Sequence, residues 1–206
     1  MNKIKYIAAA LVAVAGLGFQ QVKADVYSFN LDVGNSAISG FSGPYANVTI
    51  NRTSSTTASI TLAAYPGFLF GGGQAFDFNV NASSWSISNL VFNGTGAVSN
   101  GGANNADGFG SFNQTLDVFD GFTRAGTLLT FTLTGGAGTN WLNAMQVLIA
   151  NASGWLAAAH IFVIGNSSIL TGFATGPSTV PDGGTTVMLL GVALGALGVV
   201  RRYLTS

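Results

Sequence analysis

Few residues in this sequence could perform acid–base or nucleophilic chemistry. His160 is the single histidine, and it precedes the apolar run 161–164. A Ser-His-Asp arrangement would need Asp117 or Asp120 as its acid, but no Gly-x-Ser-x-Gly elbow is present. The sequence has no glutamate, so a glycosidase would need two aspartates as its carboxylate pair. We therefore expect a structural role for His160, and a protein that is not an enzyme.

The segment 101–108 could offer oxygen ligands to a hard cation. Asp107 and Gly108 end a run of glycine and asparagine, as in Gly/Asp-rich calcium loops. Calcium takes about six to eight oxygen ligands, and Asp117 and Asp120 are further candidates. A plain flexible loop explains the same residues. We therefore predict no cofactor and no metal, and keep Asp107 as the calcium candidate.

The three tryptophans allow two interpretations. Trp85, Trp141 and Trp155 could form an aromatic face that stacks on sugars. Large aromatic side chains in a sheet protein more often belong to the core. We expect core positions, and keep glycan binding as the alternative.

Charge is scarce in this chain of 206 residues, of which 7% are charged. The body, residues 25–179, has six aspartates and two arginines, so its formal charge is −4. Two basic residues make no electrostatic footprint for nucleic acid, which is excluded as a partner. The absence of cysteine excludes disulfides and Cys-ligated metals. Serine, threonine, asparagine and glycine replace the charged residues of helical surfaces, which favours strands and turns.

The C-terminal segment 180–206 joins a short motif, an apolar run and a basic end. In order these are Val180, Pro181, Asp182, Gly183 and Gly184, then 187–200, then Arg201 and Arg202. As a helix, the fourteen apolar residues would cover roughly 21 Å of a hydrocarbon core about 30 Å thick. We predict a marginal transmembrane helix over about 185–202, with the arginine pair at its cytoplasmic end.

These pieces, in this order, resemble the bacterial PEP-CTERM class of sorting signals. The nearest variant is the VPDSG-CTERM type, from which this sequence differs at Gly183, where the family has serine. The resemblance implies that an exosortase-type membrane peptidase cleaves the tail near the motif. The body would then reach the cell surface or an exopolysaccharide matrix. An ordinary single-pass anchor and a GPI signal are the alternatives, although the polar end 201–206 is unlike a GPI tail.

The N-terminal segment 1–24 has the features of a secretory signal peptide. Lys3 and Lys5 form a basic region, 7–19 is apolar, and Ala24 ends a small-residue cleavage site. An uncleaved membrane helix is the alternative. Basic residues beside both apolar segments keep both ends inside the cell before processing, so the body lies outside the inner membrane.

Period-two alternation of apolar and polar residues dominates the body and predicts strands. The alternating runs are 27–33, 47–51, 57–62, 76–81, 85–92 and 129–134. The phase slips near Asn89, which predicts a bulge. Many short strands with one apolar face predict an all-β fold, a β-sandwich, with a jelly roll as one topology.

Two segments of the body are ambiguous. Residues 140–159 suit a helix and a pair of strands equally well. Residues 93–111 are rich in glycine and asparagine, and we expect a mobile loop. Taken together, the features predict one exported domain, 25–179. Its expected function is that of a non-catalytic surface or matrix protein, with a glycan-binding module as the alternative.

Overall fold

The computed structural model describes residues 25–118, 122–165 and 170–177. Within these ranges the regular structure is almost entirely strand. The strands are β1 (Asp25–Leu31), β2 (Val33–Gly34), β3 (Ala46–Arg52), β4 (Thr57–Ala64), β5 (Phe68–Phe70), β6 (Gly72–Phe78), β7 (Trp85–Phe92), β8 (Val98–Ala106), β9 (Gly110–Val118), β10 (Leu128–Gly135), β11 (Ala157–Val163) and β12 (Thr171–Gly176). Two short 3-10 turns accompany them, η1 (Phe122–Arg124) and η2 (Ala144–Gln146).

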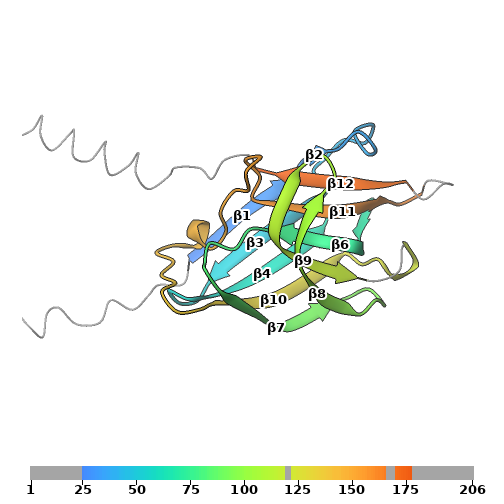
Figure 1. Ribbon diagram of the computed structural model, residues 1–206. Coiled ribbons are helices and arrows are strands. Elements are labelled where there is room, and N and C mark those ends of the chain that lie inside the picture. Colours follow the sequence, from blue (N-terminus) through green and yellow to red (C-terminus); the bar gives the residue numbers. More distant parts are fainter. Residues whose placement is uncertain (1–24, 119–121, 166–169, 178–206) are drawn as a thin grey trace, which may run out of the picture.

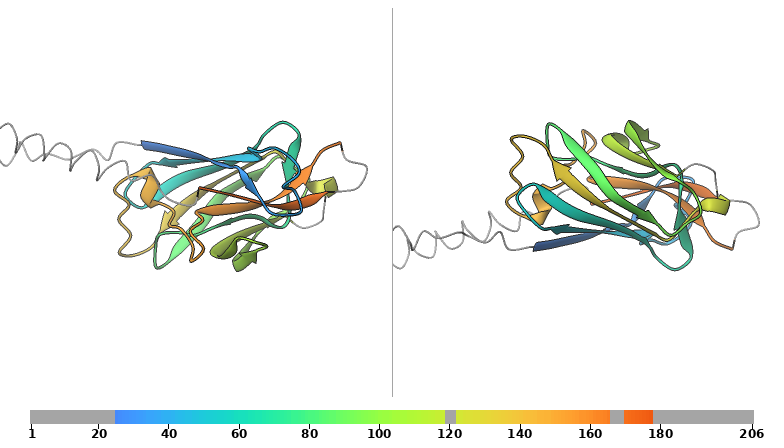
Figure 2. Two further views of the ribbon diagram at one scale, coloured as in Figure 1. Left: turned by 90° about the horizontal axis from the view of Figure 1, so that it is seen from above. Right: turned by 90° about the horizontal axis from the view of Figure 1, so that it is seen from below.

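The strands form two antiparallel sheets that pack against each other (Figure 1). The first sheet has the order β1-β3-β4-β10-β7. The second has the order β2-β12-β11-β6-β9-β8, and β5 also pairs with β11. Two further views show these layers from above and below (Figure 2). The predicted all-β, sandwich-like class is confirmed, and the jelly-roll topology stays a prediction.

Alternate residues of the first sheet line one side of the core, as the period-two pattern predicts. Ile60 of β4 lies between Ile50 of β3 and Phe131 of β10, and none of the three is more than 1% exposed. Thr61, the next residue along β4, is partly exposed on the outer face. From the second sheet, the ring of Phe78 stacks on Phe131 with centroids 5.4 Å apart. One apolar layer therefore joins the two sheets.

The bulge predicted near Asn89 is confirmed. The register of β7 against β10 shifts between Thr130 and Thr132. Asn89 has a φ of 52°, in the left-handed region that asparagine tolerates better than most residues. The extra residue lets Ile87 and Leu90 both pack against the core despite their opposite parity.

The expected mobile loop at 93–111 is wrong for most of its length. Residues 98–106 form β8, an edge strand that pairs with β9 as a long hairpin. Backbone hydrogen bonds join β8 to β9, so this edge strand can form with few apolar side chains. Gly102, with a φ of 70°, lies where the register shifts, a conformation that glycine adopts without strain.

Residues 140–159 form neither the predicted helix nor the predicted strand pair over most of their length. A single turn, η2, is capped by the Asn143 side chain, which accepts a hydrogen bond from Gln146 N. β11 begins after a further loop, at Ala157. Trp141 and Leu148 are at most 2% exposed and close one end of the core, while Leu142 is 67% exposed. The apolar spacing therefore reflects a packed loop.

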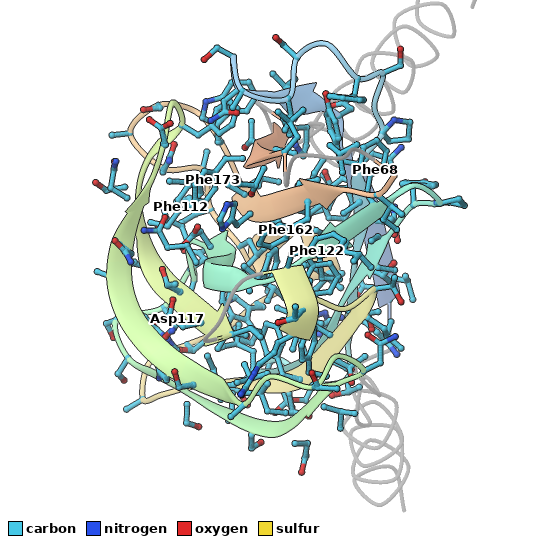
Figure 3. The ribbon with its side chains drawn as sticks, turned by 90° about the vertical axis from the view of Figure 1, so that its right-hand side faces the viewer. Phe68, Phe112, Asp117, Phe122, Phe162 and Phe173 are labelled. Atoms are coloured by element: carbon cyan, nitrogen blue, oxygen red, sulfur yellow. The ribbon has the colours of Figure 1, made fainter. Side chains whose placement is uncertain are left out.

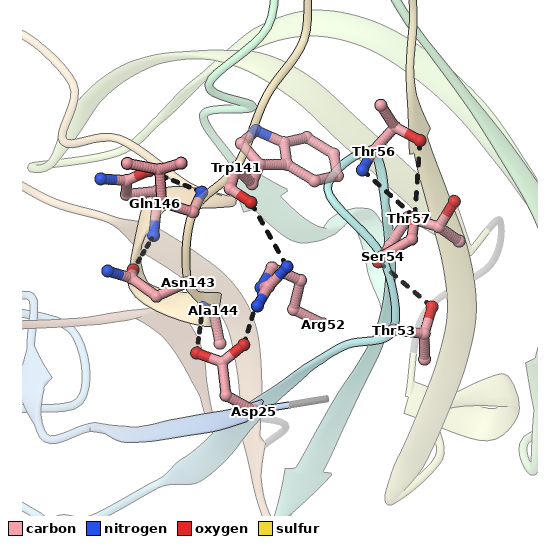
Figure 4. A network of polar contacts seen from close by, with 11 residues as sticks. Asp25, Arg52, Thr53, Ser54, Thr56, Thr57, Trp141, Asn143, Ala144 and Gln146 are labelled. Atoms are coloured by element: carbon pink, nitrogen blue, oxygen red, sulfur yellow. Dashed lines mark hydrogen bonds and ion pairs between the residues drawn. The ribbon is translucent and has the colours of Figure 1, made fainter. Parts of the chain in front are cut away.

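The first described residue is tied firmly to the body (Figure 4). One oxygen of Asp25 accepts a hydrogen bond from Arg52 Nε, and the other accepts one from Ala144 N, both at 2.7 Å. Arg52 Nη1 also donates to the Trp141 carbonyl at 3.4 Å. The residue expected to follow signal-peptide cleavage is thus part of the folded domain.

The predicted signal peptide 1–24 and the predicted helix at about 185–202 lie outside the described residues. Among those described, no helix has the length and apolar character needed to cross a membrane.

Candidate functional site

His160 lies on the outer face of the second sheet, the face turned away from the core. Its Nε2 shares a hydrogen bond with the Thr171 hydroxyl at 2.5 Å, and its ring stacks on Phe173 with centroids 4.8 Å apart. Burial lowers the pKa of His160, although the nearby backbone of Gly73 and Gly71 favours the charged form. These contacts are those of a histidine packed into a sheet face.

The described residues do not form the Ser-His-Asp arrangement considered for His160. Asp117 accepts a hydrogen bond from Gln74 N at 2.7 Å, and no hydrogen bond joins it to His160 among the described residues. Asp120 lies outside them.

Asp107 lies in the turn between β8 and β9. Asn35 Nδ2 donates to its carboxylate and to its carbonyl, both at 3.4 Å. Asp117 lies near the far end of the same hairpin, opposite Ser99, so the two carboxylates do not converge. The described ranges contain no group of three or more His, Cys, Asp or Glu side chains that could hold a metal ion.

The three tryptophans do not form one face. Trp141 is 1% exposed and donates from Nε1 to the Asn81 carbonyl at 2.8 Å. Trp85 is partly buried against the core and donates to Gln114. Trp155 packs edge-on against Phe109 on the outer side of the second sheet. A shared sugar-stacking platform is therefore absent from these three side chains.

Asp77 is the residue that sequence reasoning missed. Alternation along β6 predicts it on an exposed polar face, and this prediction is wrong because the side chain is 0% exposed. The hairpin explains the burial. Ala106, Phe109 and Phe112 pack on Ala158, which is the register partner of Asp77 on β11. Figure 3 shows the hairpin, in pale green, curving past Phe112 and Phe173.

The Asp77 carboxyl group is unusual in its surroundings. Its Oδ1 accepts a hydrogen bond from the Thr115 hydroxyl, while Oδ2 is buried with no hydrogen-bond partner in the described part of the chain. Burial raises the pKa of Asp77 to about 7; the Thr115 bond opposes this rise and the charge of Asp117 adds to it. In the sequence, Asp77 is distinguished only as the single charged residue between Arg52 and Asp107.

Asp117 is held beside this carboxyl by two special backbone positions. Gln74, whose N–H donates to Asp117, has a φ of 64°, uncommon for a residue with a side chain. On the other side, a Cβ on Gly101 would lie 2.2 Å from Asp117 Oδ2, so any side chain there would displace the carboxylate from this position. Backbone strain of this kind persists where the surrounding structure holds it in place.

Comparison with known protein families gives a match in the tail. The VPDSG-CTERM motif family matches residues 179–204.

The tail is a VPDSG-CTERM motif.

The VPDSG-CTERM motif is a PEP-CTERM-like C-terminal signal for sorting by an exosortase. The match begins one residue before Val180 and reaches past Arg202, so it covers the motif, the apolar run and the basic end together. The predicted tail signal is thus confirmed, despite Gly183 in place of serine. The cleavage role of Val180, Pro181, Asp182, Gly183 and Gly184, the membrane stop at Arg201 and Arg202, and cleavage after Ala24 stay predictions.

Neither the curated proteins nor the solved structures contain a match to this chain. The motif supports an exported, membrane-anchored precursor that is processed for the cell surface. The match is confined to the tail, so any activity of the body must be argued from the body itself.

Proposed function

We propose that this protein is a non-catalytic cargo domain of an exosortase-type sorting system. The precursor is anchored in the inner membrane by its tail, cleaved near 180–184, and carried to the cell surface or the extracellular matrix. The VPDSG-CTERM motif is the observation that carries this proposal. The folded body supports it, because the last strand in the described part of the chain ends at Gly176, upstream of the match.

The contacts of the body also fit a passive role. His160, its one histidine, is bonded to Thr171 and packed on Phe173, and no aspartate is among its partners in the described ranges. Asp25 and Gly176 both pack within the domain, Asp25 against Arg52 and Gly176 against the Asn30 carbonyl. Removal of the two terminal segments therefore leaves these contacts intact.

Replacing Pro181 and Asp182 together with alanine should leave the tail attached. Proline restricts its own φ and aspartate carries the single charge of the motif, so their loss removes what a peptidase would recognise. Intact-mass measurement of protein recovered from its own cells should show a wild-type chain that begins at Asp25 and lacks the segment 187–206. The double variant should keep that segment and stay in the membrane fraction.

Pro177→Ala, placed upstream of the motif, is the matched control and should be processed like wild type. A full-length tail on the mature wild-type surface protein would refute the proposal. So would normal trimming in cells that lack the exosortase.

A glycan-binding role is the second candidate, favoured by one polar hollow at the end of the sandwich. It has a volume of about 280 Å³ and is lined by Asn81, Ser83, Thr139, Asn140 and Trp141, with three small residues. Thr139 is part of this lining, and its hydroxyl is buried without a hydrogen-bond partner among the described residues. Amide and hydroxyl groups without charge suit a neutral sugar.

If the hollow binds a sugar, Asn140→Ala and Ser83→Ala should each weaken binding by about tenfold, the loss of one to two hydrogen bonds. A glycan array followed by titration calorimetry measures this. Asn51→Ala, on an exposed position of β3, is the control that should bind normally. An array with no hit would remove this candidate and leave the cargo role standing.

A further inference from the structure

Two residues that interact with Asp117 each carry a buried oxygen atom that lacks a hydrogen-bond donor. These atoms are Asp77 Oδ2 and Gln74 Oε1, each without a partner in the described ranges. Buried polar atoms are hydrogen-bonded in the large majority of cases, so such atoms call for an explanation. Gln74 Oε1 is an acceptor, and Asp77 Oδ2 becomes one when its carboxyl group is ionised. A bound cation is one kind of partner that serves oxygen atoms of both kinds.

The strand register brings the acidic groups to one patch. Asp77 lies directly opposite Thr115, and the Thr115 hydroxyl bonds to it, so both side chains share the outer face of the second sheet. Asp117 lies two residues further along β9, on the same side by period-two alternation. Diagonal neighbours of this kind are about 7–8 Å apart between Cα atoms, within reach for two carboxylates that share one ion.

The position of Asp117 is set before any ligand arrives. Gln74 N holds one of its oxygens at 2.7 Å, and Gly101 leaves room for the other. The positive φ of Gln74 belongs to the backbone conformation that places its N–H against the carboxylate. A patch organised in this way has the preorganisation expected of a binding site.

We propose that this patch, formed by Asp77, Asp117, Gln74 and Thr115, binds a calcium ion. The donor set consists of two carboxylates, an amide oxygen and a hydroxyl, with no nitrogen or sulfur, which suits a hard divalent cation. Calcium accepts irregular geometry and mixed ligands, whereas magnesium requires a near-ideal octahedron. With two charged ligands, the affinity belongs to the weak range of extracellular sites, a Kd of about 10⁻⁴–10⁻³ M.

This site lies apart from the Asp107 candidate and has different surroundings. Asp107 lies in the hairpin turn with its carboxylate near Asn35 Nδ2. Asp77 is fully buried and has an oxygen without a partner in the described part of the chain. The inference does not depend on the proposed cargo function, because it concerns the body alone.

The test uses the full chain in detergent, stripped with EDTA and titrated with calcium chloride or magnesium chloride. Thermal unfolding should shift upward by about 2–8 °C at 10 mM calcium and by less with magnesium. Titration calorimetry on the same sample should give one site per chain. Asp77→Asn and Asp117→Asn should each abolish the shift, while Asp107→Asn should keep it.

Asp77→Asn preserves shape and the bond from Thr115, so it should fold. No calcium-dependent shift in the wild type, or a shift that survives in both Asp77→Asn and Asp117→Asn, would overturn the site. A shift lost only in Asp107→Asn would place the ion in the hairpin turn and would also overturn it.

Discussion

Replacing Asp77 with asparagine should stabilise the protein at pH 8 and change its stability little at pH 4, in buffer with EDTA. The pKa of Asp77 is raised from 3.8 to about 7 by burial. Between these values the unfolded chain has lost a proton that the folded chain keeps, so wild-type stability falls as pH rises. Above pH 7 the cost reaches roughly 4 kcal/mol, and an uncharged asparagine avoids it.

Urea unfolding at pH 4, 6 and 8 measures this difference. The gap between Asp77→Asn and wild type should open steadily across that range. Asp107→Asn, in the exposed turn, is the control and should show no such trend. Equal stabilities at pH 8 would mean that the Asp77 carboxylate is compensated by a group other than those that surround it here.

Replacing Trp141 with alanine should lower the free energy of unfolding by about 3–5 kcal/mol, the usual cost of removing a buried aromatic side chain. Trp141 is 1% exposed and bonds to Asn81 through its indole, while its carbonyl accepts from Arg52. Loss of the ring opens a cavity at the end of the core and frees the loop that holds η2.

Chemical denaturation of the full chain measures the loss. Leu142→Ala, the neighbouring position with a side chain 67% exposed, should cost less than about 0.5 kcal/mol. Trp141→Phe should fall between the two, because it keeps most of the packing and loses the bond to Asn81. A Trp141→Ala protein as stable as wild type would contradict the core assignment and favour a ligand-binding role for this residue.

Part of the candidate site was within reach of the sequence. The inward position of Phe78 and the opposite position of Asp77 follow from alternation along one strand, β6. The burial of Asp77 does not follow from alternation, because it depends on which segment covers the outer face of the sheet. That segment is the 98–118 hairpin, whose first strand is glycine- and asparagine-rich and has no apolar periodicity.

The same limit explains 140–159. Helical spacing and loop packing both place apolar residues three or four apart. The two structures differ in whether the segment must cover an open end of the core, and a local sequence pattern does not contain that information. Trp141 and Leu148 fill that end, and the chain takes the path that allows it.

Export, tail sorting and an all-β body could be inferred from residues adjacent along the chain. The VPDGG motif, the short apolar run and the arginine pair act as a linear signal, and alternation is a property of each strand by itself. Only the tertiary structure shows that Asp77 lies beside Asp117. The same is true of the packing of His160 against Phe173 and of the space that Gly101 leaves for Asp117. Each of them depends on contacts between strands that are distant in sequence, and burial and charge interactions are set by those contacts.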